Sequence, residues 1–197
     1  VLRGTNASGN FPTGGNVWPV AIYWISLDVG TPAKSFPVAI DSGSMTLDIQ
    51  GPGCANCPKF APNNVYQPSQ SSTSKPCTLL TCHLPKTFSN TYQTCDLADP
   101  DAPCTIKGQN YRDMVSLGSL GPVPVTFGAI TYQTSNFDQF KQIDGVVGLA
   151  GAAGSGNVFE SLRSAGYIEE DMFGMCLAHG TKGNGTFTVG ALDTRLF

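Results

Sequence analysis

The chain has 197 residues, of which 41% are hydrophobic and only 13% are charged, and its formal net charge is −3. This composition supplies a buried core and excludes the polybasic surfaces that bind nucleic acid or anionic membranes. No segment approaches the roughly 18 uninterrupted apolar residues of a membrane-spanning helix, and the first residues do not begin a signal peptide. We therefore expect a soluble, already processed globular protein with neither a nucleic acid nor a membrane as partner.

The amino-terminal part of the chain predicts two strands and then a long loop region. Residues 20–32 alternate between apolar and polar side chains and break at Gly-Thr-Pro, and residues 35–41 form the returning strand. The two strands make a hairpin that ends on Asp41. Residues 51–103 are rich in Pro, Ser, Asn and Cys and show no sustained period, so we expect ordered loops that short strands interrupt.

The carboxy-terminal part predicts more strands and a single helix. Residues 111–134 indicate a strand, a turn at Gly121-Pro122 and a second strand, and residues 143–151 form a buried apolar run framed by glycines. The apolar spacing of residues 157–168 predicts a helix that stops at Gly166. Residues 171–178 and 185–192 complete the chain as a strand pair. With 23 glycines and 14 prolines between short apolar runs, the fold class is mainly β.

Six of the seven cysteines fall within residues 54–104, which is typical of a disulfide-stapled, loop-rich insertion in a secreted or vacuolar protein. The alternative is zinc, because Cys54 and Cys57 have the spacing of a ligand pair, although no second such pair exists and His83 has no matched partner. Cys176 is the expected unpaired cysteine. Sequons at Asn6 and Asn184 are glycosylation candidates that agree with secretion. The disulfide candidates are Cys54, Cys57, Cys77, Cys82, Cys95 and Cys104.

The stretch VAIDSGSMTL, residues 38–47, delivers a carboxylate from an apolar strand directly into Ser42-Gly43-Ser44. Two interpretations follow from these residues alone. Asp, Ser and Gly all favour turns, so the motif can be merely the end of a strand. It can also hold an acid for chemistry, because a glycine lets backbone N–H groups approach a carboxylate and a serine hydroxyl can donate to it.

Seven segments, in order, resemble the amino-terminal lobe of the pepsin-like aspartic proteases, and VAIDSGSMTL resembles the catalytic loop of that family. The resemblance covers about residues 20–193, and the cysteine-rich window is also similar to the plant nepenthesin-like branch. It implies a distorted β-barrel or sandwich with one or two short helices, which is half of a bilobal enzyme. The seven segments are residues 23–32, 38–47, 65–73, 113–118, 143–151, 158–177 and 185–193.

The resemblance implies an aspartic endopeptidase that acts on polypeptides without a metal or other cofactor. Asp41 would be the catalytic acid/base, with Gly43 as its close backbone neighbour and Ser44 as its outer hydrogen-bond partner. Ser42 occupies the position that braces the two lobes. The family cleaves peptides with two carboxylates that share one proton over a water molecule.

This chain supplies only one such motif, because Asp144 and Asp193 lack the Asp-[Thr/Ser]-Gly pattern. We therefore interpret residues 1–197 as a single amino-terminal lobe with an insertion at about 51–104. The second aspartate would come from a carboxy-terminal lobe that is absent from this chain, either as a separate chain or as the other product of a cleaved, zymogen-like precursor. The alternative is a non-catalytic binding protein on the same scaffold, like the plant xylanase inhibitors.

Two positions depart from the family pattern. The flap, a hairpin with Tyr-Gly-x-Gly at its tip, would have its tip near residues 99–102, and Cys95 and Cys104 could staple it. Tyr92 or Tyr111 could replace the missing phenol, although the simpler interpretation is that both are ordinary half-buried strand tyrosines. Asp48 stands where the family often has tryptophan, and we expect it to be a solvated acid at a strand end rather than a residue that raises the pKa of Asp41.

Overall fold

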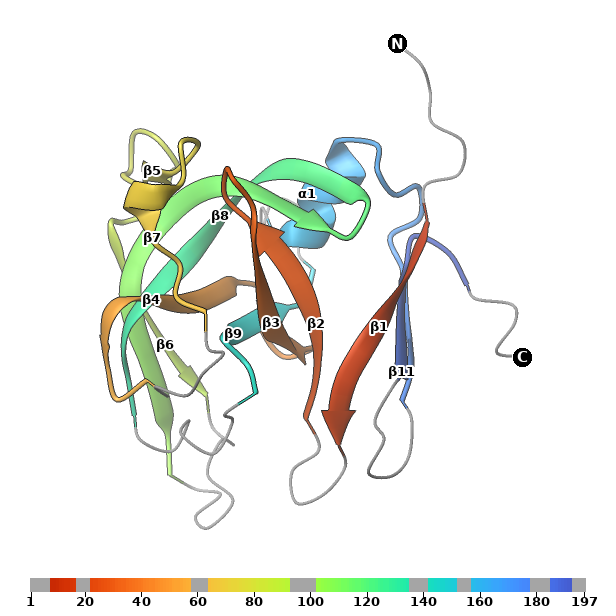
Figure 1. Cartoon of the computed structure of the whole chain (residues 1–197), viewed down its shortest axis with the longest axis horizontal. Coiled ribbons are helices and arrows are strands. Elements are labelled where there is room, and N and C mark those ends of the chain that lie inside the picture. Colours follow the sequence, from red (N-terminus) through yellow and green to blue (C-terminus); the bar gives the residue numbers. More distant parts are fainter. Residues whose placement is uncertain are drawn as a thin grey trace.

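The sheet of this protein curls until β2 (Ile22–Val29) pairs with β7 (Cys104–Leu117), and β1 (Gly9–Asn16) and β11 (Gly185–Val189) extend beyond this closure on one side (Figure 1). The structure is a computed structural model, and it describes residues 8–16, 22–57, 64–92, 102–134, 142–151, 157–177 and 185–192. The other strands are β3 (Lys34–Asp41), β4 (Leu47–Ala55), β5 (Lys75–Pro76), β6 (Thr87–Tyr92), β8 (Leu120–Gln133), β9 (Gly145–Gly148) and β10 (Phe173–Cys176). The helices are a 3₁₀ turn, η1 (Pro68–Gln70), and α1 (Val158–Ser164).

The strand order is β10-β11-β1-β2-β3-β9-β4-β8-β7-β5, and β6 pairs with β7. A further pairing of β2 with β7, at Asp28↔Ser116 and Val29↔Val115, closes the strands from β2 to β7 into a barrel. The mainly β, barrel-like fold predicted from the sequence is therefore confirmed. Two of its pairings are parallel, β3 with β9 and β4 with β8, and both involve the strands that flank Asp41.

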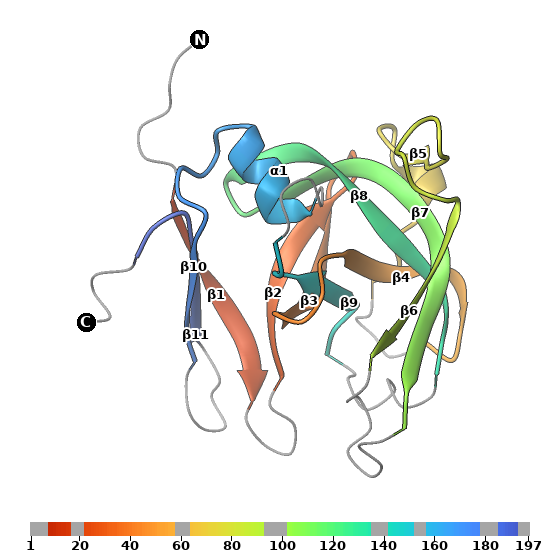
Figure 2. The ribbon, with the colours of Figure 1, turned by 180° about the vertical axis from the view of Figure 1, so that it is seen from behind.

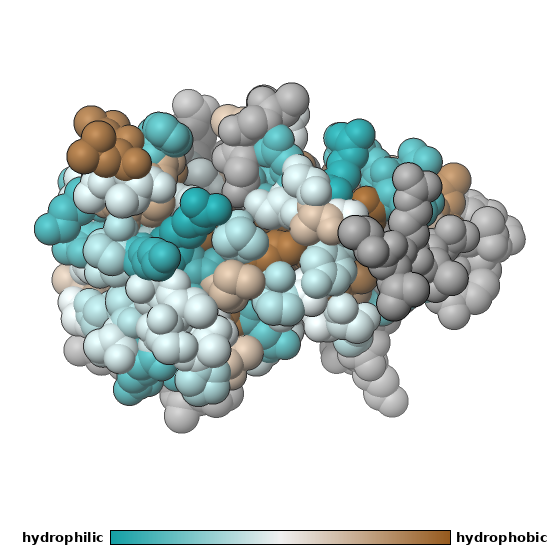
Figure 3. Space-filling model, turned by 90° about the horizontal axis from the view of Figure 1, so that it is seen from above, coloured by the Kyte–Doolittle hydropathy of each residue, from teal (hydrophilic) through white to brown (hydrophobic). Residues whose placement is uncertain are grey.

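The core lies inside the barrel and under α1. Alternate residues of β2, namely Ile25, Leu27 and Val29, are buried there, as expected for a strand with one solvated face. The helix presents Val158 and Leu162 to the same cluster and lies against β8 (Figure 2). Most of the described surface on the face seen in Figure 3 is polar, with a few exposed apolar side chains among it.

The β2–β3 hairpin, the helix and the final strand pair are where the sequence predicts them. α1 begins after Asn157, whose side chain accepts a hydrogen bond from the Glu160 N–H at 2.8 Å and so caps the helix. The helix ends before Gly166, which has φ 78°. β10 and β11 pair antiparallel, from Phe173↔Val189 onward.

The reversal between β7 and β8 lies at Gly118-Ser119, so the turn predicted at Gly121-Pro122 is wrong. Gly118 has φ 55°, the left-handed conformation that tight hairpin turns require. The ladder continues across Gly121-Pro122 with a register shift between Val115 and Leu117. A proline tolerated beside an irregularity in the ladder was therefore mistaken for the turn.

The insertion contains more strand than its composition suggests. β4 extends to Ala55, and β6 forms a six-residue ladder with β7, from Thr87↔Gln109 to Tyr92↔Cys104. This ladder is the base of the expected flap hairpin. Its tip falls within residues 93–101, which lie outside the described residues.

Disulfides join Cys54 to Cys57 and Cys77 to Cys82, so the zinc interpretation of the Cys54/Cys57 pair is wrong. Cys176 is free and exposed, as predicted. Cys104 is buried and disulfide-bonded.

Three of the predicted sites cannot be located. Cys95 lies outside the described residues, and the flap staple stays a prediction. The glycosylation candidates Asn6 and Asn184 also lie outside them. In the part of the chain that the structure describes, no helix is long and apolar enough to cross a membrane.

Candidate active site

Asp41 is the last residue of β3, and the fold holds its backbone from the neighbouring parallel strand. Asp41 is in register with Gly148 of β9, and the Leu149 N–H donates to the Asp41 carbonyl at 2.8 Å. The pairing of β3 with β9 ends at Asp41, and the chain turns away from the sheet at the next two residues. We call residues 41–46 the Asp41 loop.

The segment after β9 also fixes the rest of the Asp41 loop. The Gly148 N–H donates to the Thr46 carbonyl at 2.8 Å, and the Ala150 N–H donates to the Ser44 carbonyl at 2.9 Å. This approach is possible only because residue 148 is glycine: a Cβ there would lie 2.4 Å from the Ser44 oxygen. The apolar, glycine-framed run around β9 thus serves as the support of the loop.

Asp41 is half-buried, and one oxygen of its carboxyl group accepts a hydrogen bond from its own loop. The Gly43 N–H donates to Asp41 Oδ1 at 2.8 Å. Ser42 and Gly43 are exposed, and Ser44 is half-buried. The carboxyl group therefore has one fixed oxygen and lies beside two exposed neighbours, which leaves it accessible to a reactant while its orientation is restricted.

Tyr92, at the end of β6, belongs to the same site. Burial raises the pKa of Tyr92, the negative charges of Asp48 and Asp41 raise it further, and the Ser44 hydroxyl opposes them. The phenol is therefore near enough to both carboxyl groups to respond to their charge. Tyr92 is the half-buried strand tyrosine of the simpler interpretation, and it also lies near the two carboxyl groups.

Asp48 is buried on β4, with only 1% of its surface exposed, so the expected solvated strand-end acid is wrong. Its Oδ2 accepts hydrogen bonds from the Thr46 hydroxyl at 2.8 Å and from the Asn90 side-chain amide at 3.0 Å. Burial raises the pKa of Asp48 to about 6, although these hydrogen bonds and one from the Gly128 N–H oppose the shift.

Asn90 was not predicted from the sequence, although strand β6 carries a signal for it. Phe88, Asn90 and Tyr92 alternate along β6 and are all half-buried, whereas the residues between them are exposed. Phe88 and Tyr92 pack on a small core cluster that includes Ile106 and Ile130. The period of two was overlooked because the segment is short and polar and is surrounded by prolines and cysteines.

Asp144 makes no hydrogen bond to the Asp41 loop in the described structure. Asp144 is buried before β9, where the Asn64 N–H donates to its Oδ1 at 3.0 Å, which agrees with the structural role expected for it. Burial raises the pKa of Asp144 to about 6, against the opposing effects of Asn64 and Lys34. Asp193 lies outside the described residues.

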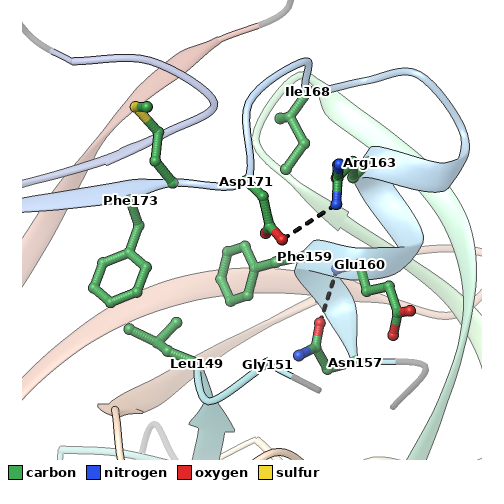
Figure 4. A pocket seen from close by; sticks show the side chains of 10 residues that line it. Leu149, Gly151, Asn157, Phe159, Glu160, Arg163, Ile168, Asp171 and Phe173 are labelled. Atoms are coloured by element: carbon green, nitrogen blue, oxygen red, sulfur yellow. Dashed lines mark hydrogen bonds and ion pairs between the residues drawn. The ribbon is translucent and has the colours of Figure 1, made fainter. Parts of the chain in front are cut away.

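A groove of about 340 Å³ runs beside α1, one residue beyond β9 (Figure 4). Leu149, Phe159 and Phe173 supply its apolar wall, and the Arg163–Asp171 ion pair, at 3.2 Å, lies on its rim. Leu149 is also the residue whose N–H holds the Asp41 carbonyl. The groove therefore adjoins the support of the Asp41 loop.

We expect the two buried carboxyl groups to make the fold less stable as the pH rises. Their pKa of about 6 in the folded protein exceeds the ordinary 3.8, so the folded state binds more protons between these values and loses stability as the pH increases across this window. Each shift corresponds to about 3 kcal/mol. Urea unfolding at about pH 4 and about pH 7 measures the loss.

Asp144→Asn should remove about half of this pH dependence. The exposed Asp171→Asn is the matched control and should change the free energy of unfolding by less than about 0.5 kcal/mol. A free energy of unfolding that rises between these two pH values would contradict the assignment of both buried carboxyl groups.

The sequence model of the eukaryotic aspartyl proteases matches residues 22–197. Among curated proteins, the chain is 25% identical to pepsin A of Rhinolophus ferrumequinum over 179 residues, which cover 89% of this chain and 42% of the relative. It is 29% identical to pepsin-2B of Gadus morhua over 175 residues, 87% of this chain and 49% of the relative. It is 26% identical to embryonic pepsinogen of Gallus gallus over 179 residues, 89% and 42% of the respective chains. The chain thus spans less than half the length of these relatives.

Proposed function

Because the chain belongs to the eukaryotic aspartyl protease family, we propose that it is one lobe of an aspartic endopeptidase in which Asp41 activates water. The observation that carries this proposal is the Asp41 carboxyl group itself. It is accessible, its Oδ1 is fixed by the Gly43 N–H, and its backbone is held from β9. A strand-ending turn without a chemical role does not require this support.

The proposed reaction needs a second carboxyl group opposite Asp41, with one proton shared between the two. The ionised carboxylate takes a proton from water, the resulting hydroxide attacks the peptide carbonyl carbon, and the protonated partner donates to the carbonyl oxygen. Collapse of the tetrahedral intermediate returns a hydroxyl proton to the partner carboxylate and breaks the C–N bond, and the leaving amine takes the proton that the first carboxyl group had removed from water. The Gly43 N–H keeps Asp41 in one orientation throughout.

We propose that the second aspartate belongs to a carboxy-terminal lobe. Two observations support this: the chain spans 42% to 49% of the relatives it matches, and the outer strand β10 carries large exposed apolar residues. Phe173 is 43% exposed, Met175 42% and the adjoining Leu177 44%. An apolar strand at the edge of a sheet favours a covering partner.

Secretion and processing from a zymogen are part of the same proposal. The two disulfides support an oxidising compartment, either extracellular or vacuolar-lysosomal. The expected substrate is an extended polypeptide held between the two lobes. The nepenthesin-like branch stays a prediction from the cysteine-rich window.

The test is cleavage of denatured globin at acid pH by the complete protein, with and without pepstatin. We expect pepstatin-sensitive cleavage by the complete protein and none by residues 1–197 alone, because one carboxyl group cannot supply both the base and the acid. Failure of the complete protein to cleave, together with tight binding of another protein, would favour the non-catalytic binder. Cleavage by the monomeric fragment would contradict the need for a second lobe.

A further inference from the structure

Asp48 lies where three separate parts of the chain meet. It belongs to β4, and the residues that contact its carboxyl group come from the Asp41 loop (Thr46), from β6 (Asn90) and from β8 (Gly128). Space around it is tight, because a Cβ on Gly128 would lie 2.2 Å from Asp48 Oδ1. A carboxyl group enclosed in this way cannot change partners without movement of the surrounding strands.

Asp48 Oδ2 connects strand β6 of the flap hairpin to the Asp41 loop, because it accepts a hydrogen bond from each of them. Asn90 Nδ2 and Thr46 Oγ1 both donate to it, at 3.0 and 2.8 Å, and Asn90 Nδ2 also lies 3.4 Å from Thr46 Oγ1. Asn90 precedes Tyr92 by two residues and therefore shares its face of β6. A shift of Asn90 along the strand must therefore also move Tyr92.

We propose that Asp48 is a positioning residue: it ties Asn90 of the flap strand β6 to Thr46 of the Asp41 loop and thereby sets where Tyr92 lies relative to Asp41. The catalytic chemistry stays with Asp41. The contribution of Asp48 is to keep the strand that carries the phenol docked at the loop that carries the acid.

The link from Asn90 through Asp48 to Thr46, which we call the tie, depends on pH in a defined direction. Burial disfavours the ionised form of Asp48. If β6 moved away from the Asp41 loop, water would reach the carboxyl group and its pKa would fall. By thermodynamic linkage, the docked position of β6 is therefore more stable when Asp48 is protonated. The ionisable groups that face this region are Tyr92 of β6 and Asp41, while the neighbours in register on β8 and β9, Gly128 and Val146, have no titratable side chain. Acidification therefore favours the docked flap.

Hydrogen exchange of residues 87–92 in the complete protein, followed by mass spectrometry, tests the tie without relying on activity. We expect Asp48→Ala and Asn90→Ala each to raise the corrected exchange rate about tenfold, because each variant loses the hydrogen bond between these two side chains. The matched control is Ser89→Ala, on the opposite, exposed face of β6, which should change it less than about twofold.

The decisive variant is the exchange of the two partners, Asp48→Asn with Asn90→Asp, which reverses the donor and the acceptor. A tie between these residues predicts that the double variant protects β6 to within about threefold of the wild type, better than either single variant. In the wild type, corrected exchange should be faster at about pH 7 than at about pH 5, and Asp48→Asn should abolish this difference.

The expected change in peptidase activity rests on the proposed function. Each single variant should lower kcat/KM about tenfold, and the double variant should restore it. Unchanged exchange in both single variants, or a double variant no better protected than they are, would overturn the tie. Absence of peptidase activity in the wild type would instead refute the proposed function and leave the exchange result intact.

Discussion

Asp41→Asn is expected to reduce kcat of the complete protein on the order of 10⁴-fold, the largest effect of any single substitution in this chain. An amide has nearly the same shape as the carboxyl group and can still accept the Gly43 N–H, so the loop should keep its conformation. It cannot take a proton from water, and the shared proton between two carboxyl groups is lost. Because folding is preserved, the loss should lie in kcat rather than in stability.

The matched control is Asp144→Asn, which makes the same chemical change at a buried aspartate away from the Asp41 loop. It should leave kcat within about twofold at acid pH, because Asp144 contacts neither Asp41 nor its loop. Steady-state kinetics on a fluorogenic peptide, with circular dichroism to confirm folding, makes the comparison. Asp41→Asn with more than a tenth of wild-type activity would remove Asp41 from the mechanism.

Gly148→Ala is the second substitution with a large expected effect, and it acts through the backbone. The added methyl group would lie 2.4 Å from the Ser44 oxygen, 2.5 Å from its carbonyl carbon and 2.6 Å from the Met45 nitrogen. These atoms cannot move away easily, because Gly148 and Ala150 hold the loop by hydrogen bonds. We expect a loss of about 3 kcal/mol in the free energy of unfolding.

Activity should fall as well, by about 100-fold, because the clash displaces the loop that orients Asp41. Gly151→Ala is the control: no atom of the described residues lies within 4 Å of the added methyl group, so the free energy of unfolding should change by less than about 0.5 kcal/mol. Urea unfolding and the peptide assay separate the two effects. A Gly148→Ala protein as stable as the control would mean that β9 does not support the loop.

The sequence was most informative where local signals agree. The β2–β3 hairpin has alternation on both sides of Gly30-Thr31-Pro32, and α1 has both a cap at Asn157 and a stop at Gly166. The motif at Asp41 could be found for the same reason, since an apolar strand and a turn meet there. Each of these predictions depends on residues close together in the chain.

The remaining features depend on distant residues, which local patterns do not record. β1 is a glycine-rich segment that becomes a strand because β11 and β2 pair with it. Asp48 looks solvated in the sequence and is buried because Asn90 and Gly128 enclose it. The same strand β6 brings Tyr92 to the Asp41 loop. Tertiary contacts decided these positions against local propensity.

The parallel partners of β3 and β4 bear on the order in which the protein folds. Asp41 is paired with Gly148, and Asp48 with Gly128, so the strands on both sides of the Asp41 loop are completed by segments 80 or more residues later in the chain. Contacts this distant in sequence form slowly, because a long loop must close first. The acid of the site is therefore put in place only after most of the lobe has been synthesised and folded, and a shortened nascent chain carries Asp41 without its working geometry.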